Sequence, residues 1–243
     1  MTKHSKHYFA QNGFSLVEMA IVLTIVALLM AGLLPSLSGQ VEQQRRNETR
    51  KQLSEIRDAL IGYALINGRL PCPADPTLIT GQAGAGAERA TCTTSANATG
   101  VVPWAKLGTS EIDGWGNRFT YRVTTSFADT TDGTGVGTCA VTTGMSFQLC
   151  SPGNLTVKSA SAGTNVAVDI PAVIISHGKN GAGAYTQQGT QLAAGSADEV
   201  ENSDGSADSI YVSHIPTSDY DDLTEWVTPN ILFSRMVSAG KLP

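Results

Sequence analysis

FSLVEMAIVLTIVALLMAGLL, residues 14–34, is an almost unbroken apolar run that contains one carboxylate, Glu18. Its 21 residues would form a helix of about 31 Å, enough to cross the hydrocarbon core of a bilayer. A charged side chain costs about 2.5–3.5 kcal/mol at the centre of a membrane-spanning helix, and less near its end. The position of Glu18 therefore needs a physical reason, and its charge needs a partner.

Composition and charge narrow the class of protein. Charged residues make up only 15% of the 243 residues, whereas Gly, Ser, Thr and Ala are abundant, which is typical of β-structure with long loops on an extracytoplasmic protein. The formal net charge is −5. Bulk electrostatics therefore do not favour nucleic-acid binding, which needs a basic surface.

Three identities fit the apolar run. It would be a secretory signal peptide if Lys3 and Lys6 formed its basic region and a peptidase cut at the small serines of Ser36-Leu37-Ser38. It would be a plain anchor if it were not cut at all. It would be a prepilin signal if cleavage fell before the run. Glu18 separates these alternatives, because a signal peptide or a simple anchor gains nothing from a carboxylate at this place.

The residues around Glu18 resemble a known family. The hexapeptide GFSLVE, residues 13–18, resembles the processing site of type IV pilins and type II secretion pseudopilins, and the short basic leader 1–13 fits it. The resemblance implies that a prepilin peptidase cuts between Gly13 and Phe14, and that the new amine of Phe14 is N-methylated. Pro35 stands where family members commonly carry a helix-weakening proline.

The resemblance also implies a role for Glu18 in assembly. Cleavage creates an ammonium on Phe14, and a buried carboxylate is strongly unfavourable without a paired cation. In the family, this carboxylate is thought to meet the amine of a neighbouring subunit. Glu18 would then fix the register in which subunits stack, which is a structural role and not a catalytic one.

The sequence predicts an α+β fold, with a long N-terminal hydrophobic helix and a β-rich head. Residues 36–66 are rich in good helix formers, and Asn67-Gly68 is a helix stop. Leu53, Ile56, Leu60 and Tyr63 recur at helical spacing, so the C-terminal half of the helix should pack on an antiparallel sheet with long loops. The expected parts are a leader at 1–13, a transmembrane and assembly helix at 14–35, the periplasmic half of the helix at 36–68 and a globular head at 69–243.

Strand-like runs in the head alternate apolar with polar residues, as half-buried antiparallel strands do. The predicted strands are Phe119–Thr125, Met145–Leu149, Asn154–Lys158, Ala172–Ser176 and Ser209–Ser213, followed by a strand that ends at Val227 and a short helix after Pro229.

A turn before the first of these strands carries a second resemblance. DGWGNRFTY, residues 113–121, is similar to a signature of the major pseudopilins, with Trp115 and Tyr121 as core anchors. The chain departs from that signature at Gly114 and Arg118, where the family often has prolines. Residues 72–100 and 124–170 look inserted relative to typical major pseudopilins.

Four cysteines lie in the head: Cys72, Cys92, Cys139 and Cys150. Two disulfides are the default in an oxidising periplasm, and four cysteines allow three pairings. The local pairs Cys72–Cys92 and Cys139–Cys150 fit two separate loops and are preferred. A zinc site is the alternative, which the absence of a closely spaced cysteine pair in the sequence disfavours.

An acidic, Gly- and Ser-rich stretch near the C-terminus suits calcium, because hard oxygen ligands on a flexible loop are what Ca²⁺ prefers. Its carboxylates belong to Asp198, Glu199, Glu201, Asp204 and Asp208. Major pseudopilins bind calcium near their C-terminus, so the resemblance supports this expectation. A simply solvated acidic loop is the alternative, and no other cofactor is expected.

The sequence offers little for an enzyme. Outside the leader only His177 and His214 remain. Ser176 and His177 are adjacent at a predicted strand end, so their side chains should diverge instead of pairing as nucleophile and base. The expectation is therefore a protein without catalytic residues.

The resemblance implies a filament subunit of a type II secretion pseudopilus or a type IV pilus. The subunit would cross the inner membrane once with its head in the periplasm, and would then move into the pseudopilus or a surface pilus. Its partners would be other subunits, the prepilin peptidase, the inner-membrane assembly platform and membrane lipid. The alternative is a minor pilin whose membrane-anchored head is an adhesive or ligand-binding module.

Overall fold

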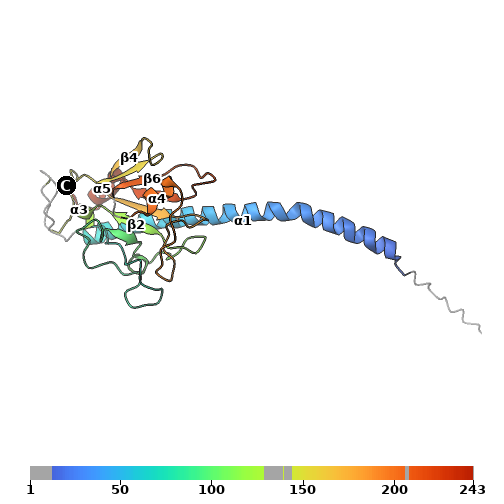
Figure 1. Ribbon diagram of the computed structural model, residues 1–243. Coiled ribbons are helices and arrows are strands. Elements are labelled where there is room, and N and C mark those ends of the chain that lie inside the picture. The colour runs from blue at the N-terminus through green and yellow to red at the C-terminus, as the bar shows by residue number, and fades with distance from the viewer. Residues whose placement is uncertain (1–12, 129–138, 140–143, 206–207, 243) are drawn as a thin grey trace, which may run out of the picture. The chain divides into compact units, whose positions relative to one another are not determined.

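A computed structural model describes residues 13–128, 139, 144–205 and 208–242, with the backbone alone at 31–38 (Figure 1). The chain divides into two compact units, Met1–Gln44 and Arg45–Pro243. The division falls inside the first helix, so the C-terminal part of this helix belongs to the head. The leader lies almost entirely outside the described residues, which begin at its last residue, Gly13.

The first helix, α1, is continuous from Leu16 to Asn67. It ends where the sequence predicts, because Gly68 adopts a φ of 72° and donates its N–H to the carbonyl of Ala64 at 2.8 Å. A Cβ at Gly68 would also collide with the carbonyl oxygen of Gly144. Both backbone conformation and space therefore require glycine at this helix end.

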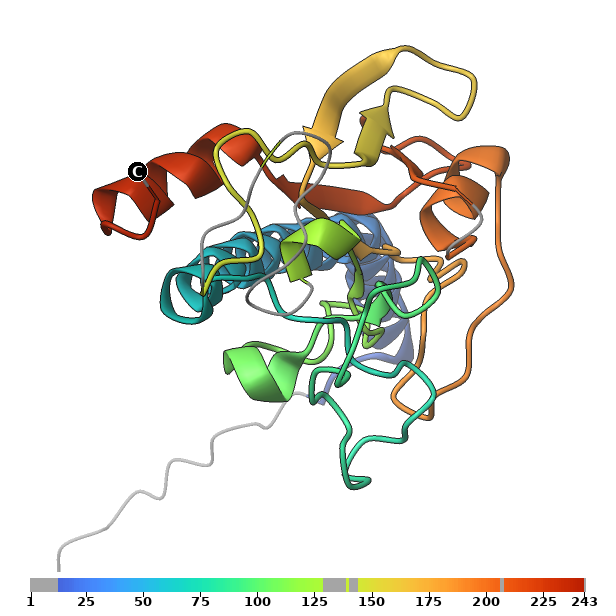
Figure 2. The same cartoon turned by 90° about the vertical axis from the view of Figure 1, so that its left-hand side faces the viewer.

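The apolar stripe of α1 packs in the head. Leu53, Ile56 and Leu60 are buried in one cluster with Tyr121 and Ile174 of the larger sheet. Figure 2 shows this part of the helix, in teal, running through the middle of the head. Burying one Leu or Ile side chain contributes about 1.5–3 kcal/mol, so the stripe holds the helix to the sheet.

The strands of the described residues form two sheets. The larger has the order β1 (Thr99–Val101), β2 (Thr120–Val123), β5 (Ala172–Ser176) and β7 (Leu223–Val227), with antiparallel neighbours throughout. The smaller has the order β4 (Asn165–Ile170), β3 (Leu155–Lys158) and β6 (Ile210–Val212). The β5 strand is buried at every position and is central to the larger sheet.

Short helices complete the described part of the head. They are α2 (Trp104–Leu107), α3 (Thr125–Ala128), α4 (Ala197–Ser203) and α5 (Pro229–Ser238). Proline is well tolerated in the first turn of a helix, so Pro229 ends β7 and starts α5 as predicted. Phe233 of α5 lies 6.2 Å from Phe127 and 6.0 Å from Phe147, ring centre to ring centre, and so joins α5 to the core.

The α+β class is confirmed, but three details of the predicted sheet are wrong. Met145–Leu149 forms no strand: its Ser146 N–H bonds to the carbonyl of Gly68, and Phe147 is buried against Phe127. Strands β1 and β4 were not expected. In addition, β3 pairs with β6 in parallel, whereas an antiparallel sheet was predicted.

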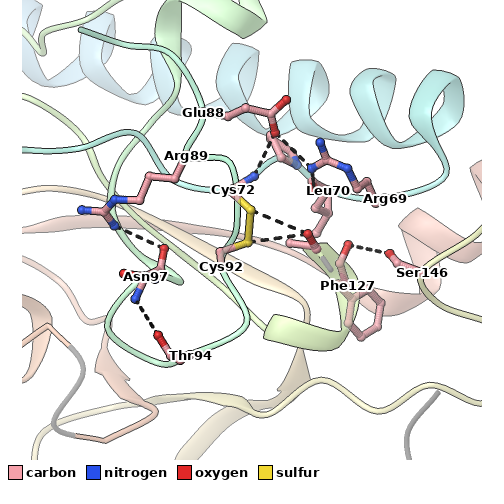
Figure 3. The surroundings of a disulfide bond; sticks show 12 residues. Arg69, Leu70, Cys72, Glu88, Arg89, Cys92, Thr94, Asn97, Phe127 and Ser146 are labelled. Atoms are coloured by element: carbon pink, nitrogen blue, oxygen red, sulfur yellow. Dashed lines mark hydrogen bonds and ion pairs between the residues drawn. A yellow bond between two sulfur atoms is a disulfide. The ribbon is translucent and has the colours of Figure 1, made fainter. Parts of the chain in front are cut away.

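The structure joins Cys72 to Cys92 and Cys139 to Cys150, the two local pairs. Figure 3 shows the first pair beside Glu88, which accepts hydrogen bonds from the N–H of Cys72 at 3.3 Å and from Arg69 at 3.0 Å. Tyr63 of α1 also donates to Glu88, at 2.8 Å. Burial acts to raise the pKa of Glu88, but the bonds from Arg69 and Tyr63 lower it overall. This carboxylate therefore ties the end of α1 to the disulfide loop.

Candidate functional site

The start of α1 gives Glu18 a partner within its own chain. The N–H of Ser15 donates to Glu18 Oε2 at 2.9 Å, and the N–H of Glu18 donates to Ser15 Oγ at 3.2 Å. This reciprocal pair is a capping box, which satisfies two of the N–H groups that a helix start leaves free. The Ser-x-x-Glu spacing signals such a cap, but it was not among the sequence-based expectations.

Large apolar side chains at this cap and further along α1 are exposed in the single chain. Phe14 is 84% exposed, Leu16 is 86% exposed and Leu28 is 70% exposed. An apolar surface of this kind marks a contact with another protein or with lipid. In the part of the chain that the structure describes, no helix reaches the length and apolar character that a membrane crossing requires. At Pro35 only the backbone is described, and it is helical.

The turn at 113–117 is a structural joint. Asp113 Oδ1 accepts the N–H groups of Trp115 and Asn117 at 2.9 and 3.0 Å, and Ser176 donates to Asp113 Oδ2 at 2.6 Å. Burial raises the pKa of Asp113, although these bonds oppose the shift. Gly114 donates its N–H to Thr49 of α1 at 3.0 Å. The turn thus connects the helix to the strands β2 and β5.

The predicted calcium residues do not form one site. The structure forms α4 where a flexible loop was expected, and α4 turns the carboxylates in different directions. Asp198 accepts from the N–H of Ser161 at 2.7 Å and lies 3.0 Å from the ring of His214. Glu199 completes a capping box with Ser196. Of the five, Glu201, Asp204 and Asp208 come together, with carboxylate oxygens within 4.8 Å of one another.

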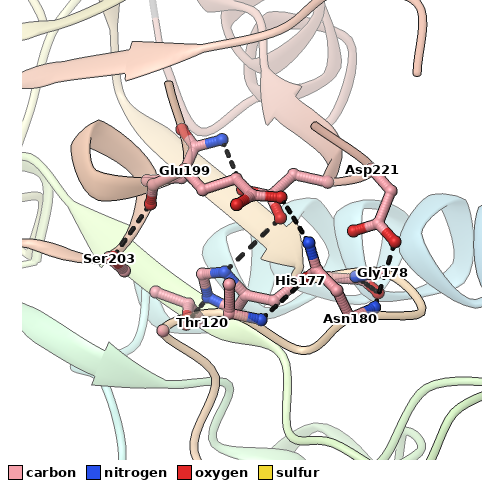
Figure 4. A network of polar contacts seen from close by, with 12 residues as sticks. Thr120, His177, Gly178, Asn180, Glu199, Ser203 and Asp221 are labelled. Atoms are coloured by element: carbon pink, nitrogen blue, oxygen red, sulfur yellow. Dashed lines mark hydrogen bonds and ion pairs between the residues drawn. The ribbon is translucent and has the colours of Figure 1, made fainter. Parts of the chain in front are cut away.

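Glu199 instead joins two carboxylates that were not expected. One carboxylate oxygen of each of Glu199, Asp221 and Asp222 lies within 4.8 Å of the other two. Glu199 is 1% exposed and Asp222 is 2% exposed. Figure 4 shows Glu199 and Asp221 with Asn180, whose side chain donates to Glu199 at 2.7 Å and whose N–H donates to Asp221 at 3.0 Å. The adjacent aspartates 221 and 222 were visible in the sequence as a possible pair of ligands. They lie more than 20 residues after Glu199, so the sequence alone did not place the three carboxylates together.

This buried acidic group fits a hard cation. Oδ1 of Asp221 and Oδ1 of Asp222 have no hydrogen-bond partner among the described residues. The ring of His177 lies beside this group, with its Nδ1 3.7 Å from Asp222 Oδ1. Buried carboxylates are unfavourable without compensation, and carboxylate oxygens are preferred ligands of Ca²⁺. The donor set therefore suits calcium.

Ser176 and His177 bond to different partners. Ser176 Oγ donates to Asp113, whereas His177 Nε2 lies 2.8 Å from the hydroxyl of Thr120. His177 is completely buried. Its contacts thus connect β2 to the acidic group, and they do not join it to Ser176.

Comparison with known proteins locates one match. Residues 9–34 match the family model described as the prokaryotic N-terminal methylation motif. No curated protein and no solved structure matches the chain significantly. The match confirms that the N-terminal segment is of the kind found in type IV pilins and pseudopilins, and it points to a structural filament subunit and not to an enzyme.

Proposed function

Because the chain carries the N-terminal motif of type IV pilins and pseudopilins, we propose that it is a pilin-like subunit of a type II secretion pseudopilus or a type IV pilus. The match at 9–34 carries this proposal. A prepilin peptidase cuts between Gly13 and Phe14, and the amine of Phe14 is N-methylated. The helix at 14–35 anchors the chain in the inner membrane with its head in the periplasm, until the assembly platform adds the subunit to a filament.

The geometry at Glu18 supports the assembly step. The capping box occupies Oε2 of Glu18 and thereby fixes the rotamer of the carboxylate. The other oxygen, Oε1, accepts from an ammonium. In the filament this ammonium belongs to Phe14 of a neighbouring subunit, and the buried charges neutralise each other. The exposed apolar side chains of α1 face lipid before assembly and other subunits after it.

The proposal is tested at the new N-terminus. Mass spectrometry of the protein from membranes of a piliated or secreting host should find a chain that starts at N-methylated Phe14. Gly13→Ala should reduce processing while leaving the total amount of membrane-associated protein unchanged, so that uncleaved precursor accumulates. A mature chain that starts at Gly39, or an intact chain, would contradict the proposal.

A second proposed property is calcium binding at Glu199, Asp221 and Asp222. The buried carboxylates of Glu199 and Asp222 and the unpartnered Oδ1 atoms of the two aspartates support it. The ion would neutralise charge and hold α4 against the segment before β7. Saturating calcium should then stabilise the full chain by about 2.7 kcal/mol at a hundredfold excess over Kd.

Thermal unfolding with chelator and with millimolar calcium measures this effect. Asp222→Asn should abolish the calcium-dependent gain in stability. Asp208→Asn is the matched control, because Asp208 belongs to the acidic group of Glu201 and Asp204. This variant should keep the calcium-dependent gain in stability. Unfolding curves that are the same with chelator and with calcium would contradict the proposed calcium site.

A further inference from the structure

A cavity of about 350 Å³ lies where the two sheets of the head meet. Thr99 and Gly100 of β1, Thr120 of β2 and Tyr211 of β6 line it, together with the C-terminal end of α4. Its volume falls in the range of small-molecule sites, which is about 300–1,000 Å³. Neither the disulfides nor the acidic group at Glu199 forms part of it.

The lining of this cavity is polar and balanced in charge. Its hydroxyl and amide groups come from Thr77, Thr99, Thr120, Tyr185, Gln191, Asn202, Ser203 and Tyr211. Arg89 and Asp204 supply one charge of each sign. Such a lining offers both donors and acceptors and does not select a strongly charged or a purely apolar ligand.

Tyr211 has a buried hydroxyl that needs a partner. The residue is 2% exposed, and its hydroxyl oxygen makes no hydrogen bond to any described residue. An unsatisfied hydroxyl in the protein interior is unfavourable, and native structures rarely leave one. Since Tyr211 lines the cavity, a ligand hydroxyl would satisfy it.

Other groups of the lining are held in fixed orientations. His177 lies 2.8 Å from Thr120 Oγ1, and the two labelled side chains face each other in Figure 4. Asn202 donates to Asp222 at 2.8 Å and accepts from the N–H of Val212 at 2.8 Å. Gln191 donates to the carbonyls of Gly183 and Ser203, each at 3.1 Å. A site whose polar groups are already positioned loses little entropy when it binds.

We propose that this cavity binds a neutral polyhydroxylated ligand, with a saccharide unit as the chemical class. The hydroxyls of Thr120 and Tyr211 and the side-chain oxygen of Gln191 bond to the ligand hydroxyls. The rings of Tyr185 and Tyr211 give its C–H groups apolar contact. This activity goes beyond filament assembly, and it specifies the ligand class for the binding-module alternative.

The test uses the full chain in a zwitterionic detergent, because maltoside detergents would supply sugar. Glucose, galactose, mannose and N-acetylglucosamine are the probes, and sodium glutamate is the charged comparison. Saturation-transfer NMR and calorimetry should detect saturable binding of at least one sugar and none of glutamate. Failure of every sugar to bind at millimolar concentration, or binding of glutamate alone, overturns the proposal and leaves the filament role untouched.

Two variants locate the site. Ala96 is exposed and lines the cavity, so Ala96→Trp should fill it and abolish sugar binding without disturbing the core. Val166→Trp is the matched control, since Val166 is also exposed but lies on β4 outside the cavity, and it should bind normally. Tyr211→Phe should weaken binding about 3- to 10-fold, the effect of one lost neutral hydrogen bond. If Ala96→Trp binds the sugar as tightly as the wild type does, the sugar does not bind in this cavity.

Discussion

Arg118 is completely buried, and it is one of the two positions at which the turn 113–121 departs from the pseudopilin signature. Its Nε donates to Glu111 at 2.9 Å, and its Nη1 donates to the carbonyls of Pro76 and Leu78 at 3.0 and 2.8 Å. The guanidinium also stacks over Trp104 at 4.9 Å. A single arginine thus fixes the segment 76–80, which belongs to an apparent insertion, to the strand β2.

Arg118→Met should destabilise the full chain by about 3–5 kcal/mol, because it leaves the carboxylate of Glu111 without its buried partner. Arg118→Lys should recover only part of this loss, since an ammonium cannot match the geometry of a guanidinium. Chemical denaturation followed by circular dichroism measures both. The control is Lys51→Met, whose ion pair with Glu55 is exposed and should change stability by less than about 1 kcal/mol. Equal losses of stability in Arg118→Met and Lys51→Met would contradict the proposed role of Arg118.

Asp204 gives the head a predicted dependence on pH. Burial raises the pKa of Asp204 to about 6, and the nearby charges of Asp208 and Glu201 add to the shift. The folded state therefore binds this proton more tightly than the unfolded state, whose carboxyl has a pKa of about 3.9. The favourable contribution of the protonated form is complete below pH 4 and is lost as the pH rises through 6.

Asp204→Asn should accordingly be more stable than the wild type above pH 6 and equal to it below pH 4. Because Asp204 is partly solvated, the gain should stay under about 1 kcal/mol. Unfolding curves from pH 3.5 to 8 in the presence of chelator measure the difference. Asp219→Asn is the control, an exposed aspartate outside the cluster. A difference that does not vary with pH would refute the assignment.

At the scale of elements, the sequence was informative where the pattern is local. The limits of α1, β5 and the β7–α5 junction follow from apolar spacing, a continuous apolar run and Pro229. The strand β1 was not predicted because it has only three residues and includes a glycine, which is uncommon in strands. The fold requires this glycine, since a Cβ at Gly100 would collide with the carbonyl of Ala74. β4 escaped because most of its positions are exposed. The parallel pairing of β3 with β6 depends on contacts distant in sequence, which no local pattern reveals.

The two disulfide loops should differ in their resistance to reduction. Cys72 and Cys92 are 3% and 1% exposed, whereas Cys150 lies on the surface. Thiol attack requires access to a sulfur atom, so mild reductant should open Cys139–Cys150 first. Alkylation of the native protein followed by mass spectrometry gives the order. Full denaturation before reduction is the control, because both pairs should then react together. Early labelling of Cys72 or Cys92 in the native protein would show that burial does not protect them.

Each disulfide should also contribute to stability. In the loop-entropy account, closing loops of these lengths stabilises a protein by about 3 kcal/mol each. The double variant Cys72→Ser with Cys92→Ser should therefore lose roughly 2–4 kcal/mol in denaturant unfolding. The corresponding variant at 139 and 150 is the matched comparison and should lose a similar amount. A loss below 1 kcal/mol for either pair would mean that the loop is already ordered without its crosslink.

For the whole molecule, the sequence predicts the assembly residues from one short segment, but it did not group the head carboxylates that the fold brings together. Gly13, Phe14 and Glu18 stand within six consecutive residues, so a resemblance over a short segment was enough to predict their roles. Glu199 and Asp222 are brought together only by the packing of α4 against the segment before β7. Sequence reasoning therefore grouped Glu199 with its chain neighbours, although α4 points Asp198 toward His214 instead.

Assembly itself can be separated from helix capping by two variants at the start of α1. Glu18→Gln removes the charge and keeps the shape, and glutamine can still serve in a capping box. Processing after Gly13 should continue, while filament assembly should fail or slow, because the incoming Phe14 ammonium loses its counter-charge and an unpaired buried charge costs several kcal/mol. The measurement compares the processed membrane pool with the yield of sheared filaments or periplasmic pseudopili.

Ser15→Ala is the complementary variant, because it removes the Ser15 side chain of the cap and keeps the carboxylate. Loss of a cap costs about 1 kcal/mol of helix stability. This cost falls on a helix that lipid or neighbouring subunits also hold, so filament yield should decrease only slightly. If charge pairing is the essential function of Glu18, Glu18→Gln must reduce assembly far more than Ser15→Ala does. Equal defects would assign Glu18 to the cap, and normal assembly of Glu18→Gln would show that subunits find their register by apolar packing alone.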